Sequence, residues 1–113
     1  MKIFYGCSEG KSDVSGDAPV VAYLETALAV FRGLDARSGF MGVNLDSRFV
    51  LQMARTKDGK VRIELLDTSI PAFDACEAEP QFAEDLIRAA FEGVDVFQIA
   101  RAGNYKWEHL NMS

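Results

Sequence analysis

Acidic side chains are the most concentrated chemical groups in this sequence. Between residues 67 and 87 there are six carboxylates and no lysine or arginine. The rest of the chain holds eleven acidic and twelve basic residues, so the formal net charge of −5 arises in this one stretch. A local excess of negative charge attracts positively charged molecules. The sequence therefore predicts a surface that binds a basic protein partner.

Two large apolar side chains fall within the same acidic stretch. Ile70 and Phe73 lie in the segment 68–77, which Pro71 interrupts and which we predict to be irregular. Interfaces between proteins often have an apolar centre and a polar rim. The predicted partner-binding residues are Asp67, Ile70, Phe73, Asp74, Glu77, Glu79, Glu84 and Asp85.

The second half of the acidic charge also has a simpler explanation. Glu79, Glu84 and Asp85 fall in the first two turns of a predicted helix, where each acid stabilises the helix dipole by about 0.3–1 kcal/mol. The acids before Glu79 are not explained in this way. Asp74, Glu77 and Glu79 are spaced loosely like oxygen ligands of a cation, but they lack the order of a calcium-binding loop.

Other residues with reactive side chains show no catalytic spacing. The run from Gly6 to Ser12 resembles the phosphate-binding loop GxxxxGK[ST], but its two glycines are one residue too close together. His109 is the only histidine, and Cys7 and Cys76 form no CxxC pair, so the chain holds no zinc ligand set. His109 is better interpreted as a packing or edge residue of a strand. We therefore predict no enzyme activity, no cofactor and no metal site.

The composition is that of one globular domain spanning residues 1–113. The chain is 49% hydrophobic and 26% charged, with a pI near 4.8. This acidity argues against nucleic-acid binding, which needs a basic surface. The sequence shows neither a signal peptide nor a long apolar run. We expect a cytoplasmic protein with reduced thiols.

The spacing of apolar residues predicts an α+β fold. Strands are expected at residues 2–7, 40–45, 48–55, 61–66, 94–101 and 105–110, and helices at 18–32 and from Pro80 to Gly93. Asp58-Gly59 predicts a hairpin turn between two of these strands. The order β-α-β-β-β-α-β-β predicts a mainly antiparallel sheet of five to six strands. Two helices are expected on one face, covering its phenylalanine-rich side.

In size, acidity and element order the chain resembles the cytosolic immunity proteins of bacterial polymorphic and contact-dependent toxin systems. The resemblance implies a protein that binds a cognate toxin, commonly a basic nuclease, and blocks its active site. It carries over no individual residue.

Two other classes of function stay open at this point. A small-molecule-binding or enzymatic domain predicts a pocket lined by Tyr5, Phe40, Tyr105 and Trp107. A subunit of a homo-oligomer predicts an exposed sheet edge, formed by the last strand, that pairs with its copy.

Overall fold

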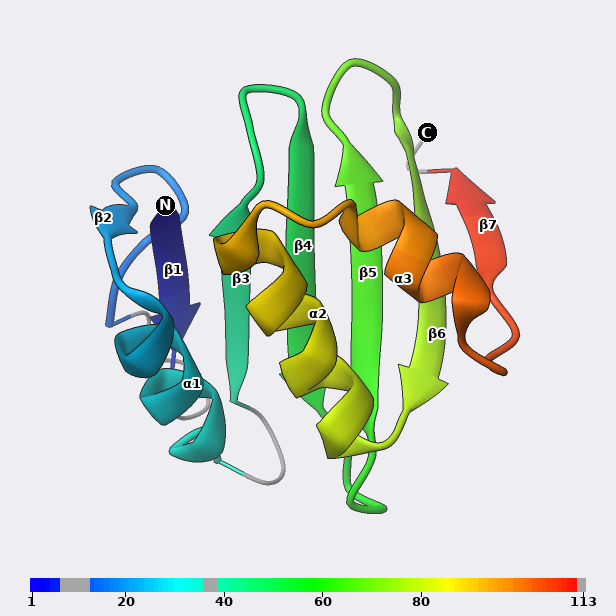
Figure 1. Ribbon diagram of the computed structural model, residues 1–113, viewed down its shortest axis with the longest axis horizontal. Helices are drawn as coiled ribbons and strands as arrows, with labels where there is room; N and C mark the ends of the chain where they lie inside the picture. Colours follow the sequence, from blue (N-terminus) through cyan, green and yellow to red (C-terminus); the bar gives the residue numbers. More distant parts are fainter. Residues whose placement is uncertain (7–12, 36–38, 112–113) are drawn as a thin grey trace.

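The computed structural model describes residues 1–6, 13–35 and 39–111 (Figure 1). Most of the run that resembles a phosphate-binding loop, together with Cys7, lies outside the described residues. None of the helices in the described ranges is long and apolar enough to span a membrane.

The described residues form one antiparallel sheet and three helices. The strands are β1 (Lys2–Gly6), β2 (Val20–Val21), β3 (Phe40–Asn44), β4 (Phe49–Arg55), β5 (Val61–Asp67), β6 (Ala72–Ala78) and β7 (Glu108–Asn111). The helices are α1 (Leu24–Arg32), α2 (Pro80–Glu92) and α3 (Val96–Ala102). Across the sheet the strand order is β2-β1-β3-β4-β5-β6-β7. The predicted α+β class with a mainly antiparallel sheet is confirmed, although the structure has seven strands and three helices in these ranges.

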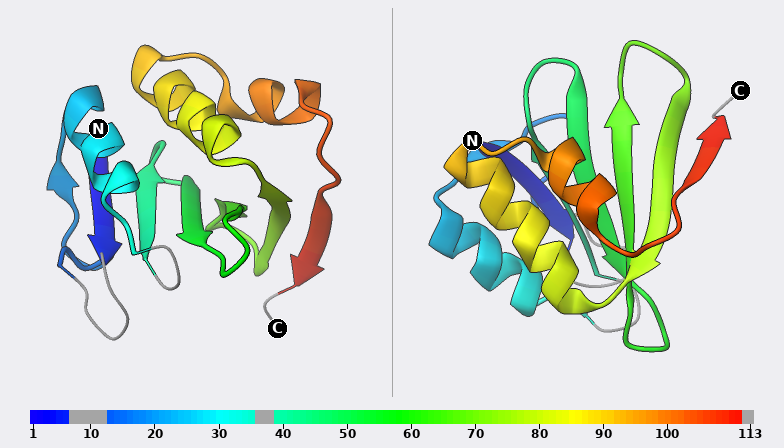
Figure 2. Two further views of the ribbon diagram at one scale, coloured as in Figure 1. Left: turned by 90° about the horizontal axis from the view of Figure 1, so that it is seen from below. Right: turned by 45° about the vertical axis from the view of Figure 1, so that its right-hand side comes forward.

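All three helices lie on the same face of the sheet (Figure 2). The core fills the space between the two layers, and its largest fully buried side chains include Phe31 of α1 and Leu86 of α2. Met41, Leu51 and Ile63 meet them from neighbouring strands, and each is 0% exposed. We call this side of the sheet the covered face and the other side the open face. No helix of the described part of the chain lies over the open face.

Local signals explain the ends of the two better-predicted elements. Pro80 occupies the start of α2, where its missing N–H costs no hydrogen bond, and Gly93 ends the helix with φ of 75°. The turn between β4 and β5 places Gly59 at φ of 80°, a conformation that favours glycine. Both predictions are confirmed. They depend only on the backbone preferences of residues within each short segment, and distant contacts do not change them.

Two predicted elements are wrong. The segment 68–77 is irregular only in the turn at 68–71, because Ala72–Ala78 forms β6 and pairs with β5 along its whole length. The segment 94–101 is not a strand, because Asp95 accepts hydrogen bonds from the backbone N–H groups of Phe97 and Gln98 and caps α3. A short apolar run fits either a strand or a buried helix, and here the cap decides.

The first helix is also shorter than predicted. Val20 and Val21 pair with β1 as the edge strand β2, so α1 begins only at Leu24. The last strand is confirmed at the sheet edge, but it covers only Glu108–Asn111.

The prediction that the helices cover a phenylalanine-rich face is wrong. Phe4, Phe40 and Phe73 occupy register positions of the open face, whereas Phe49 lies on the covered side with its ring 4.9 Å from that of Phe97. Aliphatic residues and methionines make up most of the covered face.

Candidate functional site

The predicted partner-binding residues do not form one surface. Side chains alternate between the two faces of a strand, so the neighbours Phe73 and Asp74 of β6 point in opposite directions. Phe73 and Glu77 belong to the open face, and Asp74 belongs to the covered face. Asp85 lies on α2, where its carboxylate accepts a hydrogen bond from the side chain of Gln81 at 3.0 Å.

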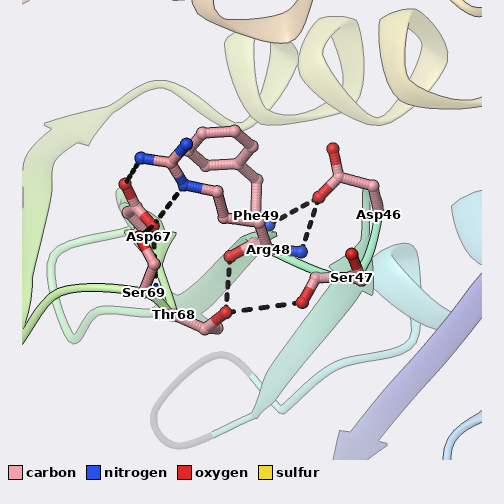
Figure 3. Close-up of polar contacts among 7 residues, drawn as sticks. All are labelled: Asp46, Ser47, Arg48, Phe49, Asp67, Thr68 and Ser69. Atoms are coloured by element: carbon pink, nitrogen blue, oxygen red, sulfur yellow. Dashed lines mark hydrogen bonds and ion pairs between the residues drawn. The ribbon is translucent and has the colours of Figure 1, made fainter.

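Asp67 ties two turns together at one end of the sheet (Figure 3). Its two oxygens accept hydrogen bonds from the Nε and Nη2 atoms of Arg48 at 2.8 and 2.6 Å. Ser69 also donates to this carboxylate, and Thr68 donates its hydroxyl to the carbonyl oxygen of Arg48. The bonds from Arg48 and Ser69 hold the pKa of Asp67 well below its usual range. The negative charge of Asp67 is therefore paired with Arg48 inside the protein.

Two further acids of the predicted site are paired with bases that are distant in sequence. Glu79 lies 2.7 Å from the Nζ atom of Lys60. Glu84 of α2 accepts two hydrogen bonds from Arg32 of α1, at 2.7 and 3.2 Å, and these lower its pKa. Counting charges along the sequence did not detect these pairs, because both bases come from other elements. Three of the six acids of the stretch are thus paired with a lysine or arginine in the folded protein.

Asp74 and Ile70 lie apart from these pairs. Asp74 contacts the Nδ1 atom of His109 at 2.7 Å across the β6–β7 pair. His109 is therefore an edge-strand residue, as the sequence suggested. Ile70 is 46% exposed in the turn between β5 and β6.

Strand pairing builds a continuous apolar surface that the sequence does not show. In the register of the sheet, Val50 faces Leu66, Leu66 faces Phe73, and Phe73 faces Leu110. We call these four residues, which cross β4, β5, β6 and β7 on the open face, the apolar row. All four are half-buried, and none belongs to the core. Only Phe73 was predicted as a site residue. The other three lie outside the acidic stretch or in other strands, and the strand pairing alone brings them next to Phe73.

Three acids lie on the open face beside the apolar row. Glu64 and Glu108 belong to the next row of cross-strand neighbours, and Glu77 belongs to the row after it. Glu64 accepts hydrogen bonds from Gln52 at 2.5 Å and from Arg62 at 3.1 Å. The ion pairs formed within the described part of the chain include neither Glu77 nor Glu108. The open face thus combines apolar and acidic groups, as the sequence predicts for a binding surface. Of the residues predicted for that surface, however, only Phe73 and Glu77 are among those described here on the open face.

The aromatic residues predicted to line a small-molecule pocket do not gather. Tyr5 and Phe40 point to opposite faces of the sheet. The ring of Tyr105 packs on Phe82 at 4.6 Å, and the indole N–H of Trp107 donates to the carbonyl oxygen of Ala100 at 3.3 Å. A pocket built from these four side chains is therefore excluded.

A hollow of about 500 Å³ lies at the end of the sheet, between the β3–β4 turn and the α2–α3 link. Its lining includes Leu45, Phe49 and the carboxylates of Asp46 and Asp95. Asp46 accepts hydrogen bonds from the backbone N–H groups of Arg48 and Phe49, and Asp95 caps α3. The two carboxylates thus stabilise a turn and a helix end, and we place the candidate site on the open face instead.

Two observations bear on metal and thiol chemistry. Over residues 1–6, 13–35 and 39–111, no three histidine, cysteine or acidic side chains lie close enough together to hold a metal ion. Burial raises the pKa of the Cys76 thiol to about 11, so this cysteine is a protonated thiol at neutral pH.

Comparison with known proteins identifies no relative. No protein-family model, no curated protein and no solved structure matches the chain.

Proposed function

We propose that this protein binds a basic protein partner through the open face of its sheet, in the cytoplasm, and neutralises it as an immunity protein neutralises a bacterial toxin. The observation that carries the proposal is the apolar row, which crosses four strands on a face that no described helix covers. An apolar patch beside polar groups is the usual anatomy of a protein–protein interface.

The charge of the protein supports a basic partner. A net charge of −5 on 113 residues attracts positively charged proteins over several ångströms and raises their association rate. Glu77 and Glu108 lie near the apolar row and form no internal ion pair in the described part of the chain. They are the acids best placed to contact lysine or arginine residues at the rim of the interface.

The breadth of the apolar row, which crosses four strands, supports a protein as the ligand. The half-buried side chains of Leu66 and Phe73 face each other near the turn that joins β5 and β6, and a partner can cover them without any change in the strand pairing. Side chains on strands that are hydrogen-bonded on both sides lose little backbone conformational entropy on binding. A neutralising protein benefits from this property because it must bind tightly to its target.

The test takes the product of the gene directly upstream as the candidate partner, and we expect that product to be a basic protein. We expect the wild-type protein to bind it in calorimetry and to protect cells that produce it. Leu66→Asp should weaken binding by at least about tenfold, because a charge in the apolar row loses its hydration on contact.

Val94→Asp is the matched control, because Val94 is 44% exposed and lies away from the open face, in the α2–α3 link. Both variants should keep the wild-type circular dichroism spectrum. Full binding by the Leu66→Asp variant, or equal losses in the two variants, would place the interface elsewhere.

A further inference from the structure

The open face contains a hollow next to the apolar row. Its volume is about 300 Å³, and it is lined by Phe4, Phe40, Met41, Gln52, Met53, Ala54 and Glu64. Phe4 forms one wall because its ring lies against Gly42, where an added Cβ atom would come within 2.0 Å of the ring. Glycine at this position therefore leaves the space that the Phe4 ring occupies.

Glu64 is the charged residue of the lining. Its side chain is only 20% exposed, and the other walls are apolar except for the amide of Gln52. Gln52 donates its Nε2 hydrogen to Oε1 of Glu64 at 2.5 Å, which holds the carboxylate in place. Two phenyl rings and one fixed carboxylate match a cation with an apolar stem.

Glu64 forms an ion pair with Arg62 through a single contact. The Nε atom of Arg62 lies 3.1 Å from Oε2 of Glu64, and the Arg62 side chain is 41% exposed. Because the Arg62 side of this pair meets solvent, the contact contributes little stability. Arg62 also faces Glu77 directly across the β5–β6 pair, on the same side of the sheet. Arg62 can therefore exchange one carboxylate for another without losing an ionic partner.

We propose that the hollow receives an arginine side chain of the basic partner, which rests on the function proposed above. The aliphatic stem packs between Phe4 and Phe40, and the guanidinium group donates to Glu64 while Arg62 turns to Glu77. Arginine fits better than lysine because its planar group bonds a carboxylate with two N–H donors and stacks on aromatic rings.

A small probe tests the hollow separately from the partner. N-acetyl-arginine amide is titrated into the isotope-labelled protein, and the side-chain amide signals of Gln52 are followed by NMR. We expect these signals to shift, and we expect the neutral N-acetyl-norleucine amide to shift them much less. Glu64→Gln should weaken binding of the arginine probe by about tenfold, because the charge-assisted hydrogen bonds are lost.

Variants of the two neighbouring charges give effects of opposite sign. Arg62→Gln should strengthen binding of the arginine probe, because Glu64 loses its internal competitor. Glu77→Gln should weaken it, because Arg62 then stays on Glu64. Unchanged Gln52 signals on addition of the probe, or equal binding by the wild-type and Glu64→Gln proteins, would overturn the proposal.

The partner distinguishes failure of the hollow from failure of the proposed function. If the hollow is used, Glu64→Gln weakens binding of the upstream-encoded protein as well as of the probe. If Leu66→Asp abolishes partner binding and Glu64→Gln leaves it intact, the open face is the interface but the hollow receives no arginine. If the probe binds and Leu66→Asp has no effect on the partner, the hollow binds guanidinium groups but the proposed interface is wrong.

Discussion

The two faces of the sheet are built from alternate residues of the same strands, yet they differ in what lies over them. In β5, Ile63 and Leu65 are buried under the helices, whereas Leu66 is half-buried on the open face. Leu65 and Leu66 are chemically identical neighbours. The burial of a leucine in this sheet therefore depends on which face the helices cover and not on the residue type.

The charged groups show the same contrast. On the helix side and at the sheet ends, Glu84, Glu79 and Asp67 are each paired with a base that is distant in sequence. On the open face, Glu77 and Glu108 form no such pair in the described part of the chain. The first group holds elements together, and the second is exposed to solvent.

The largest expected effect compares one apolar residue from each face. Ile63→Ala should lower the free energy of unfolding by about 2–5 kcal/mol, because it removes fully buried methyl groups and leaves a cavity. Leu66→Ala should cost less than half as much, since its side chain already meets solvent. Urea denaturation measures both values, and equal losses would contradict the distinction between the faces.

A smaller effect is expected where the open face is tightly packed. Gly42→Ala should lower the free energy of unfolding by about 1–3 kcal/mol, because the new methyl group collides with the ring of Phe4. Gly16→Ala is the matched control, since its Cβ atom would lie 3.9 Å from the same ring. Thermal denaturation of the two variants should therefore differ, and similar melting temperatures would mean that Phe4 moves aside without cost.

The ion pair at the end of the sheet predicts a pH effect. The folded pKa of Asp67 lies below its unfolded value, so its contribution to stability is complete above the unfolded pKa and is lost as the pH falls toward the folded pKa. Between about pH 5 and pH 2, the wild-type protein should lose more stability than the Asp67→Asn variant. Urea denaturation across this range measures the difference, and parallel curves would show that the Arg48 contact adds nothing.

The smallest effect on stability is expected for an open-face acid. Glu108→Lys should change the free energy of unfolding by no more than about 0.5 kcal/mol, because the side chain is exposed. It should nevertheless weaken binding of the upstream-encoded partner and reduce its dependence on salt. Asp85→Lys on α2 makes the same change of charge away from the open face and should leave both properties of binding close to wild type. The reverse result would favour α2 as the interface.

Short-range signals explain which parts of the fold were predictable. The β4–β5 hairpin follows from Asp58-Gly59, and α2 follows from Pro80 and Gly93, since each signal acts within its own turn. β6 was not predictable from its own residues. Its alternation is weak and Pro71 precedes it, but hydrogen bonds to strands on both sides hold it in the sheet.

The sequence by itself determined the class of fold, the amphipathic patterns of the main strands and the excess of acidic residues. The tertiary structure alone decided which acids remain unpaired, since Arg32, Arg48 and Lys60 reach their partners across other elements. It also decided which face is open. A cross-strand row such as that of Leu66 and Phe73 exists only once the register is fixed, because register joins residues that are far apart along the chain.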